Sequence, residues 1–181
     1  KKKFFKYYRI FINQTSFLLR NIGVNINTSP VMDVRRKESN NIIGDRSFGT
    51  NPKIVSIIGK YCIDNFDKNN IASIMKHIPG HGLSKMDSHL GTPIVNEKLK
   101  KLISNDFFPF MNNNSLIAMT AHIIYSDIDP KFTATHSKKV IKIIRSIIKF
   151  KNILISDDIS MKSLKLSVKN NTIKSFQAGC D

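Results

Sequence analysis

Residues 76–89 hold an unusual concentration of side chains that can do chemistry. Their sequence is KHIPGHGLSKMDSH, which contains three of the five histidines of the chain. Imidazole titrates near neutral pH, and a carboxylate beside it can orient the ring and stabilise its charged form. His89, with Asp87 two residues before it, is therefore the best candidate for a general acid/base. The alternative is an ordinary exposed loop histidine.

Two histidines of this stretch also have the spacing of a metal site. His77 and His81 are four residues apart, as on a zinc-binding helix. Pro79 and Gly80 lie between them, and proline interrupts a helix, so we do not expect both imidazoles on one helical face. We expect no metal and no cofactor, and we keep a metal site as an alternative.

A second candidate group follows the apolar run at 152–156, where Asp157 and Asp158 are adjacent. Side chains alternate along a strand, so one carboxylate can face a site while the other makes structural hydrogen bonds. A carboxylate nucleophile with a separate proton donor is the machinery of glycoside hydrolysis, and Asp157 is our candidate nucleophile. The alternative is that both carboxylates only cap the next helix.

Helical and strand patterns alternate along the chain and position these groups. The apolar periodicity and the turn residues predict five helices: one over 4–22, one that starts at 51, one over 97–111, one that starts at 137, and a last, looser one that ends near 177. They predict strands over 24–34, 71–78, 116–125 and 152–156. The final AGCD looks like the approach to a further strand. Strict alternation with apolar strands favours parallel pairing in an α/β fold.

Several polar residues share one position in this pattern, at or just after the carboxyl end of a predicted strand. They are Asp33, Lys76, His77, His122 and Asp157. In a TIM-type (β/α)8 barrel the active site is built at this rim from several strands, whereas a doubly wound sheet binds ligands at its switch point. An eight-unit barrel needs about 250 residues. We therefore expect residues 1–181 to form a single partial (β/α) barrel catalytic domain with both ends missing.

Composition narrows the possible partners. The net charge of +16 comes from lysines spread along the whole chain, without an aromatic-and-basic motif, so we expect no nucleic acid partner. No apolar run approaches 18 residues and no signal peptide is visible, so we expect no membrane association. Two cysteines are too few for a disulfide framework and fit a reducing compartment, so we expect a cytoplasmic protein. We also expect a monomer whose partner is a small saccharide or muropeptide substrate.

The motifs together resemble those of a known family. KHIPGHG followed by four residues and DSH is similar to the signature of bacterial β-N-acetylglucosaminidases of glycoside hydrolase family 3, the peptidoglycan-recycling type. Further matching motifs occur in the family's order and at similar spacings: SPVMDV at 29–34, GDRSFG at 44–49, MTAHIIYSDIDP at 119–130, SDDISMK at 156–162 and AGCD at 178–181. The resemblance covers essentially the whole chain and implies the family barrel from about strand 3 to strand 7.

The resemblance also implies roles for individual residues. Asp157 would be the nucleophile, and His89 the general acid/base with Asp87 as its dyad partner on a flexible loop. Hydroxyl groups of the bound N-acetylglucosamine would be held by Lys76, His77 and Arg46. His81 would shape the loop rather than react.

The implied activity is that of a retaining exo-β-N-acetylglucosaminidase. It would release N-acetylglucosamine from peptidoglycan-derived muropeptides through a covalent glycosyl-enzyme, without metal or cofactor. Two alternatives remain. One is a metal-dependent barrel hydrolase with His77, His81 and Asp157 as ligands, and the other is a non-catalytic sugar-binding remnant.

Overall fold

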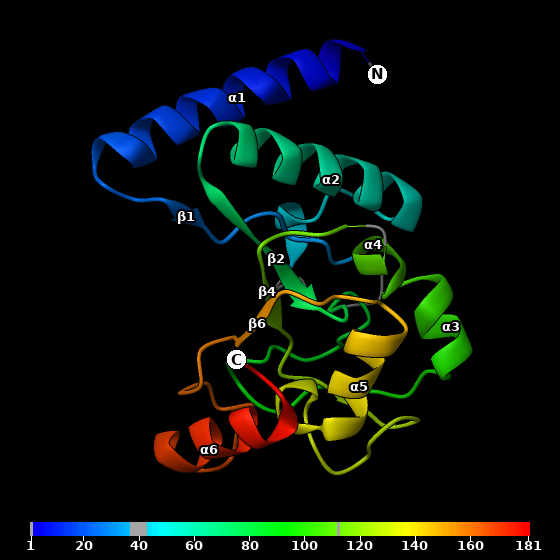
Figure 1. Cartoon of the computed structure of the whole chain (residues 1–181). Coiled ribbons are helices and arrows are strands. Elements are labelled where there is room, and N and C mark those ends of the chain that lie inside the picture. The colour runs from blue at the N-terminus through cyan, green and yellow to red at the C-terminus, as the bar shows by residue number, and fades with distance from the viewer. Residues whose placement is uncertain (1, 37–42, 112) are drawn as a thin grey trace.

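The computed structural model describes residues 2–36, 43–111 and 113–181. Most helices and strands alternate along these ranges (Figure 1), but the strict alternation that the sequence predicts is interrupted where β3 follows β2, α4 follows α3 and β5 follows β4. The elements are α1 (Lys2–Asn21), β1 (Ile26–Asn27), the 3-10 turn η1 (Gly44–Arg46), α2 (Pro52–Lys68), β2 (Ala72–Ile78), β3 (Ile94–Val95), α3 (Leu99–Ser104), α4 (Phe108–Met111), β4 (Ile117–Thr120), β5 (Ile124–Tyr125), the 3-10 turn η2 (Ala134–His136), α5 (Lys138–Ser146), β6 (Ile153–Ser156) and α6 (Val168–Ala178).

The predicted helix starts at 51 and 137 are confirmed by their capping bonds. The side chain of Asn51 accepts hydrogen bonds from the backbone N–H groups of Lys53 and Ile54, and proline follows it at the first helical position. The hydroxyl of Ser137 accepts from the N–H of Val140. Each cap satisfies N–H groups that have no partner inside the helix.

Three predicted elements differ in the structure. The helix predicted over 97–111 is divided into α3 and α4, because the backbone leaves the helical region at Asn105 and Pro109 lacks an N–H group. The strand predicted over 116–125 is divided into β4 and β5. The strand predicted over 24–34 is regular only at β1, and residues 30–32 continue beside β2 through bonds to Lys76.

The main sheet has the order β1-β2-β4-β6, and every neighbouring pair is parallel. A separate parallel pair joins β3 to β5, which the sequence did not predict. The backbone N–H of Asp181 donates to the carbonyl of Leu154, so the chain ends beside β6 as expected for the approach to another strand. Parallel strands joined through helices confirm the predicted α/β class.

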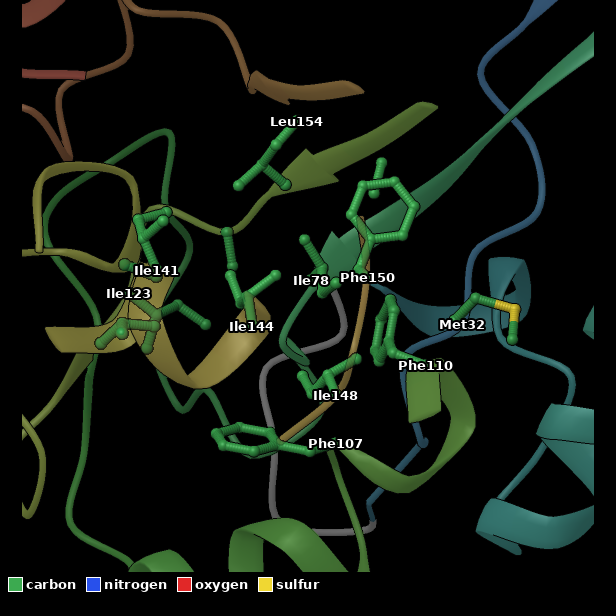
Figure 2. Close-up of a cluster of buried hydrophobic side chains, with 14 of the residues drawn as sticks. Met32, Ile78, Phe107, Phe110, Ile123, Ile141, Ile144, Ile148, Phe150 and Leu154 are labelled. Atoms are coloured by element: carbon green, nitrogen blue, oxygen red, sulfur yellow. The ribbon is translucent and has the colours of Figure 1, made fainter. Parts of the chain in front are cut away.

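The register gives the sheet two different faces. Met75, Ala118 and Leu154 are register neighbours, all fully buried, and belong to the main hydrophobic core. Figure 2 shows this core, where aliphatic side chains of β2, β6 and α5 gather with aromatic ones. On the opposite face Ile153 is 44% exposed, although a closed barrel would bury that face in its interior.

Strand β2 contains a β-bulge near its carboxyl end. Lys76 pairs with Met119 and Ile78 pairs with Thr120, so His77 is an extra residue relative to β4. Regular alternation would place Met75 and Ile78 on opposite faces, but both belong to the main core. The bulge therefore lets Lys76 and His77, which are consecutive, both turn away from that core.

The first helix packs on α2 through a smaller core. Its members are Ile12, Cys62, Phe66 and Ile71. Within the described ranges, no helix combines the length and the apolar character that crossing a membrane requires.

Candidate active site

Strand β6 brings Asp157 to the carboxyl-end rim. Its carboxylate Oδ2 lies 3.8 Å from Nε2 of His77, and its side chain is 25% exposed. The carboxylate of Asp158 instead accepts bonds from the N–H and the hydroxyl of Ser160 at 2.8 and 2.7 Å. Oδ1 of Asp157 accepts from the backbone N–H of Asp158 at 2.9 Å. Asp157 therefore faces the end of a neighbouring strand through Oδ2, and Asp158 stabilises the turn that follows β6.

Asp33 fixes the position of His77. Its carboxylate is fully buried, and Oδ2 lies 2.7 Å from Nδ1 of His77. Oδ1 accepts from the backbone N–H of His81 at 2.6 Å and from that of His77 at 3.3 Å. One buried carboxylate therefore holds both the imidazole and the start of the loop that follows β2.

The ionisation of Asp33 also sets the tautomer of His77. Burial by itself would raise the pKa of Asp33, but the nearby His77 and His81 lower that pKa on balance. An ionised carboxylate can only accept hydrogen bonds, so Nδ1 of His77 carries the proton and donates it. The other ring nitrogen, Nε2, is the one that faces Asp157.

Lys76 and Arg46 add positive charge at the same rim. Burial lowers the pKa of Lys76, and the charge of Arg46 lowers it further, while Asp157 and Asp33 act in the opposite direction. Arg46, Asp157 and Asp33 therefore each lie within electrostatic range of Lys76. Two cationic donors beside a carboxylate acceptor can bind a ligand rich in hydroxyl groups.

The predicted dyad is formed in the loop after β2. Oδ1 of Asp87 accepts from the backbone N–H of His89 at 2.7 Å and lies 2.9 Å from its Nδ1. The backbone bond is the main cause of the lowered pKa of Asp87. Because Asp87 is then ionised, Nδ1 of His89 donates and Nε2 is left facing outward.

The dyad stands apart from Asp157 in this conformation. The side chain of His89 is 64% exposed, and among the described residues no hydrogen bond or ion pair joins it to Asp157. The charge of His89 nevertheless contributes to lowering the pKa of Asp158. The structure thus brings Lys76, His77 and Asp157 together and leaves the dyad at the margin.

The two ends of the dyad loop are anchored. A Cβ atom on Gly82 would lie 2.0 Å from the carbonyl oxygen of Val34, so only glycine fits there. At the other end the hydroxyl of Thr92 donates to the carbonyl of Ser163 at 2.8 Å. Between these anchors Met86 and Leu90 are exposed, whereas Ser84 and Ser88 are buried.

Two further histidines support the site. His81 is buried, which lowers its pKa to about 4, so it is neutral near pH 7. His122 uses both ring nitrogens, with Nδ1 2.7 Å from the hydroxyl of Thr135 and Nε2 3.0 Å from the carbonyl of Asp158. His122 therefore holds the turn after Asp157. The sequence placed it at a strand end but could not show these partners.

In the part of the chain that is described, no three His, Cys, Asp or Glu side chains are arranged to hold a metal ion. The imidazoles of His77 and His81 are 5.6 Å apart between ring centroids. Nδ1 of His77 is already bonded to Asp33.

Comparison with known proteins gives the chain a family context. The profile described as "Glycosyl hydrolase family 3 N terminal domain" matches residues 13–181. A beta-hexosaminidase of Idiomarina loihiensis is 32% identical over 167 residues, which cover 88% of this chain and 49% of that protein. The chain thus spans about half the length of this curated relative.

Solved structures show the same fold. A glycoside hydrolase family 3 beta-N-acetylglucosaminidase from Paenibacillus sp. str. FPU-7 matches 94% of this chain and 34% of its own, with 28% identity and a TM-score of 0.89. NagZ from Neisseria gonorrhoeae, in complex with N-trifluoroacetyl-D-glucosamine, matches 97% of this chain and 52% of its own, with 30% identity and a TM-score of 0.83. The predicted partial (β/α) barrel is therefore confirmed.

Proposed function

The chain belongs to the family of glycosyl hydrolase family 3 N-terminal domains, and from this premise we propose that the protein is a retaining exo-β-N-acetylglucosaminidase. The observation that carries the proposal is the position of Asp157, 3.8 Å from His77 at the rim that also bears Lys76. The names of the relatives, beta-hexosaminidase and beta-N-acetylglucosaminidase, support the same substrate class.

Asp157 is the proposed nucleophile. Its carboxylate attacks the anomeric carbon of N-acetylglucosamine, the bond to the leaving oxygen breaks, and a covalent glycosyl-enzyme forms. Lys76 and Arg46 donate hydrogen bonds to sugar hydroxyls. His77 is held by Asp33 with Nε2 directed at the same space, so it binds the sugar in a fixed orientation.

His89 is the proposed general acid/base. It protonates the leaving oxygen in the first step. In the second step it takes a proton from the water that attacks the anomeric carbon, the bond between that carbon and Asp157 breaks, and the sugar is released. Asp87 stabilises the charged imidazole. The imidazole is exposed on a loop anchored at both ends, so we propose that substrate binding closes this loop over the sugar.

The finer assignments come from the sequence motifs. We propose that the natural substrates are muropeptides derived from peptidoglycan and that the protein acts in the cytoplasm as a monomer, within one barrel domain. The presence of only two cysteines, both free thiols, supports a reducing compartment.

The test is replacement of Asp157 by Ala in the intact protein. Hydrolysis of an aryl β-N-acetylglucosaminide should fall by at least roughly a thousandfold, because the covalent step loses its nucleophile. Asp158→Asn is the matched control and should lose far less. Full activity in Asp157→Ala would sink the assignment, and a parent protein that binds the sugar without turnover would indicate a non-catalytic sugar-binding protein.

A further inference from the structure

The sheet alone does not hold the proposed nucleophile in place. The last paired residues of β4 and β6 are Thr120 and Ser156, so Asp157 lies one residue beyond the parallel ladder. Attack on an anomeric carbon requires a carboxylate oxygen in a fixed position and orientation. Contacts outside the ladder must therefore orient Asp157.

A continuous series of hydrogen bonds leads from two buried threonines to this carboxylate. The hydroxyls of Thr120 and Thr135 are 2.8 Å apart, and that of Thr135 lies 2.7 Å from Nδ1 of His122. Nε2 of His122 lies 3.0 Å from the carbonyl oxygen of Asp158, whose N–H donates to Oδ1 of Asp157 at 2.9 Å. The two threonines and His122 are at most 1% exposed, so bulk water does not compete for their bonds.

The direction of these bonds follows from the chemistry of the groups. A carbonyl oxygen only accepts, so Nε2 of His122 carries the proton. Burial lowers the pKa of His122, so at neutral pH its Nδ1 carries no proton and accepts from the hydroxyl of Thr135. That hydroxyl also lies 3.3 Å from the carbonyl oxygen of Ala121, which is the longer contact. The oxygen of Thr135 in turn accepts from Thr120.

The last bond of the series distinguishes the two oxygens of the Asp157 carboxylate. Oδ1 accepts from the N–H of Asp158, whereas Oδ2 lies 3.8 Å from Nε2 of His77, on the side where the sugar is proposed to bind. The carbonyl of Asp158 also accepts from the N–H of Met161, but that bond lies within the same turn. His122 is what ties this turn to the end of β4.

We propose that Oδ2 of Asp157 is the attacking oxygen and that His122 is a positioning residue, which holds the backbone of Asp158 so that its N–H stays on Oδ1. Oδ2 bonds to the anomeric carbon, the bond from that carbon to the leaving oxygen breaks with its electron pair on that oxygen, and His89 supplies the proton. Oδ1 becomes the carbonyl oxygen of the ester and keeps its hydrogen bond. The inference rests on the proposed glycosidase function and deepens it.

Two substitutions separate the two ring nitrogens of His122. The amide of Gln reaches about as far as Nε2 and can donate to the carbonyl of Asp158, whereas the shorter Asn reaches only the place of Nδ1. In the intact protein, His122→Asn should lower kcat and kcat/KM for an aryl β-N-acetylglucosaminide together, by roughly tenfold to a hundredfold with KM unchanged. His122→Gln should recover most of the loss. Equal losses in both variants, or no loss in either, would overturn the positioning role.

Two other positions supply a control and a milder test. His136 also places Nε2 3.1 Å from a carbonyl oxygen, that of Asn171, but this bond leads to α6, so His136→Asn should leave kcat unchanged. Thr135→Val removes the donor to Nδ1 of His122 and should lower kcat, whereas Thr135→Ser retains it. This pair decides the question even where His122→Asn does not fold, because equal kcat in Thr135→Val and Thr135→Ser would count against the series.

The choice of oxygen is tested by a crystal structure of the intact protein with the ester trapped by a fluorinated N-acetylglucosaminide. The sugar should be bonded to the carboxylate oxygen of Asp157 that does not accept from the N–H of Asp158. A sugar on the other oxygen would overturn the assignment.

A measurement without turnover separates failure of this inference from failure of the proposed function. In the intact protein labelled with nitrogen-15 histidine, NMR near pH 7 should show His122 with a protonated Nε2 and an unprotonated Nδ1, in signals that are absent from His122→Gln. The opposite tautomer or a doubly protonated ring would overturn the inference and leave the glycosidase proposal standing. The expected tautomer in a parent protein that does not hydrolyse the aryl glycoside would overturn the proposed function, and the role in attack with it.

Discussion

Asp33 and His77 form a buried contact in the site. The negative charge of the Asp33 carboxylate orients the imidazole of His77. Asp33→Asn keeps the size of the side chain and removes the negative charge, so Nδ1 of His77 no longer faces an obligatory acceptor. We expect kcat to fall on the order of 10²-fold through loss of orientation, with the protein still folded.

The measurement is kcat, KM and the pH profile of the variant, with circular dichroism as the control for folding. Asp33→Glu restores the charge and should recover part of kcat, which a purely space-filling role would not predict. A variant Asp33→Asn with the kcat and pH profile of the parent would show that Asp33 does not position His77 for the reaction.

The imidazole of His89 is exposed and is not in contact with Asp157 in this structure. Its proposed role as the proton donor therefore requires the loop to close over the bound substrate. His89→Ala should slow the hydrolysis of a natural saccharide much more than that of an aryl glycoside with a good leaving group, because the latter needs little protonation. The two substrates are compared by kcat/KM on the same preparation. Equal losses for both substrates would argue against proton donation by His89.

At the scale of the elements, the loop after β2 packs its backbone closely against the backbone at Val34. A Cβ on Gly82 would lie 2.0 Å from the carbonyl oxygen of Val34, which is backbone and cannot turn away. Gly82→Ala should therefore lower the free energy of unfolding by about 1–3 kcal/mol and reduce kcat as the loop shifts. Urea unfolding and steady-state kinetics measure the two effects.

Gly91 offers the matched control within the same loop. A Cβ there would lie 3.1 Å from the sulfur of Met86, a flexible and half-exposed side chain that can move. Gly91→Ala should therefore change stability and kcat much less than Gly82→Ala. Equal effects of the two substitutions would mean that contact with Val34 is not what restricts position 82.

For the molecule as a whole, the buried carboxylate of Asp106 should make stability depend on pH. Burial raises its pKa from 3.8 to about 6, although Arg36 lies 3.3 Å away. The native state therefore binds the proton more tightly than the unfolded state does. The stabilising contribution is present below about pH 3.8 and is lost as the pH rises through about 6.

Asp106→Asn removes this contribution and tests it. The free energy of unfolding of the parent minus that of the variant should be larger at pH 4 than at pH 7, by up to about 3 kcal/mol. His81, whose pKa is lowered by burial, changes stability in the opposite direction in both proteins and largely cancels in the difference. Urea unfolding at a series of pH values gives the curve, and a difference that stays constant would contradict the prediction.

Local patterns in the amino-acid chain were enough to predict the order of most elements and the rim residues. Helical periodicity, the caps at Asn51 and Ser137 and the apolar strands are encoded by neighbours in the sequence, so they could be found without coordinates. The same holds for the pairing of Asp87 with His89, which spans two residues.

Other features depend on contacts between distant parts of the chain and could not be derived from local patterns. Asp33 reaches His77 across 44 residues, and the bulge that turns Lys76 and His77 to the same side appears only in the pairing of β2 with β4. The β3–β5 pair likewise joins separate segments of the chain. The physical reason is that periodicity and capping are set by adjacent residues, whereas register, burial and the ionisation of a buried group are set by whatever the fold packs against them.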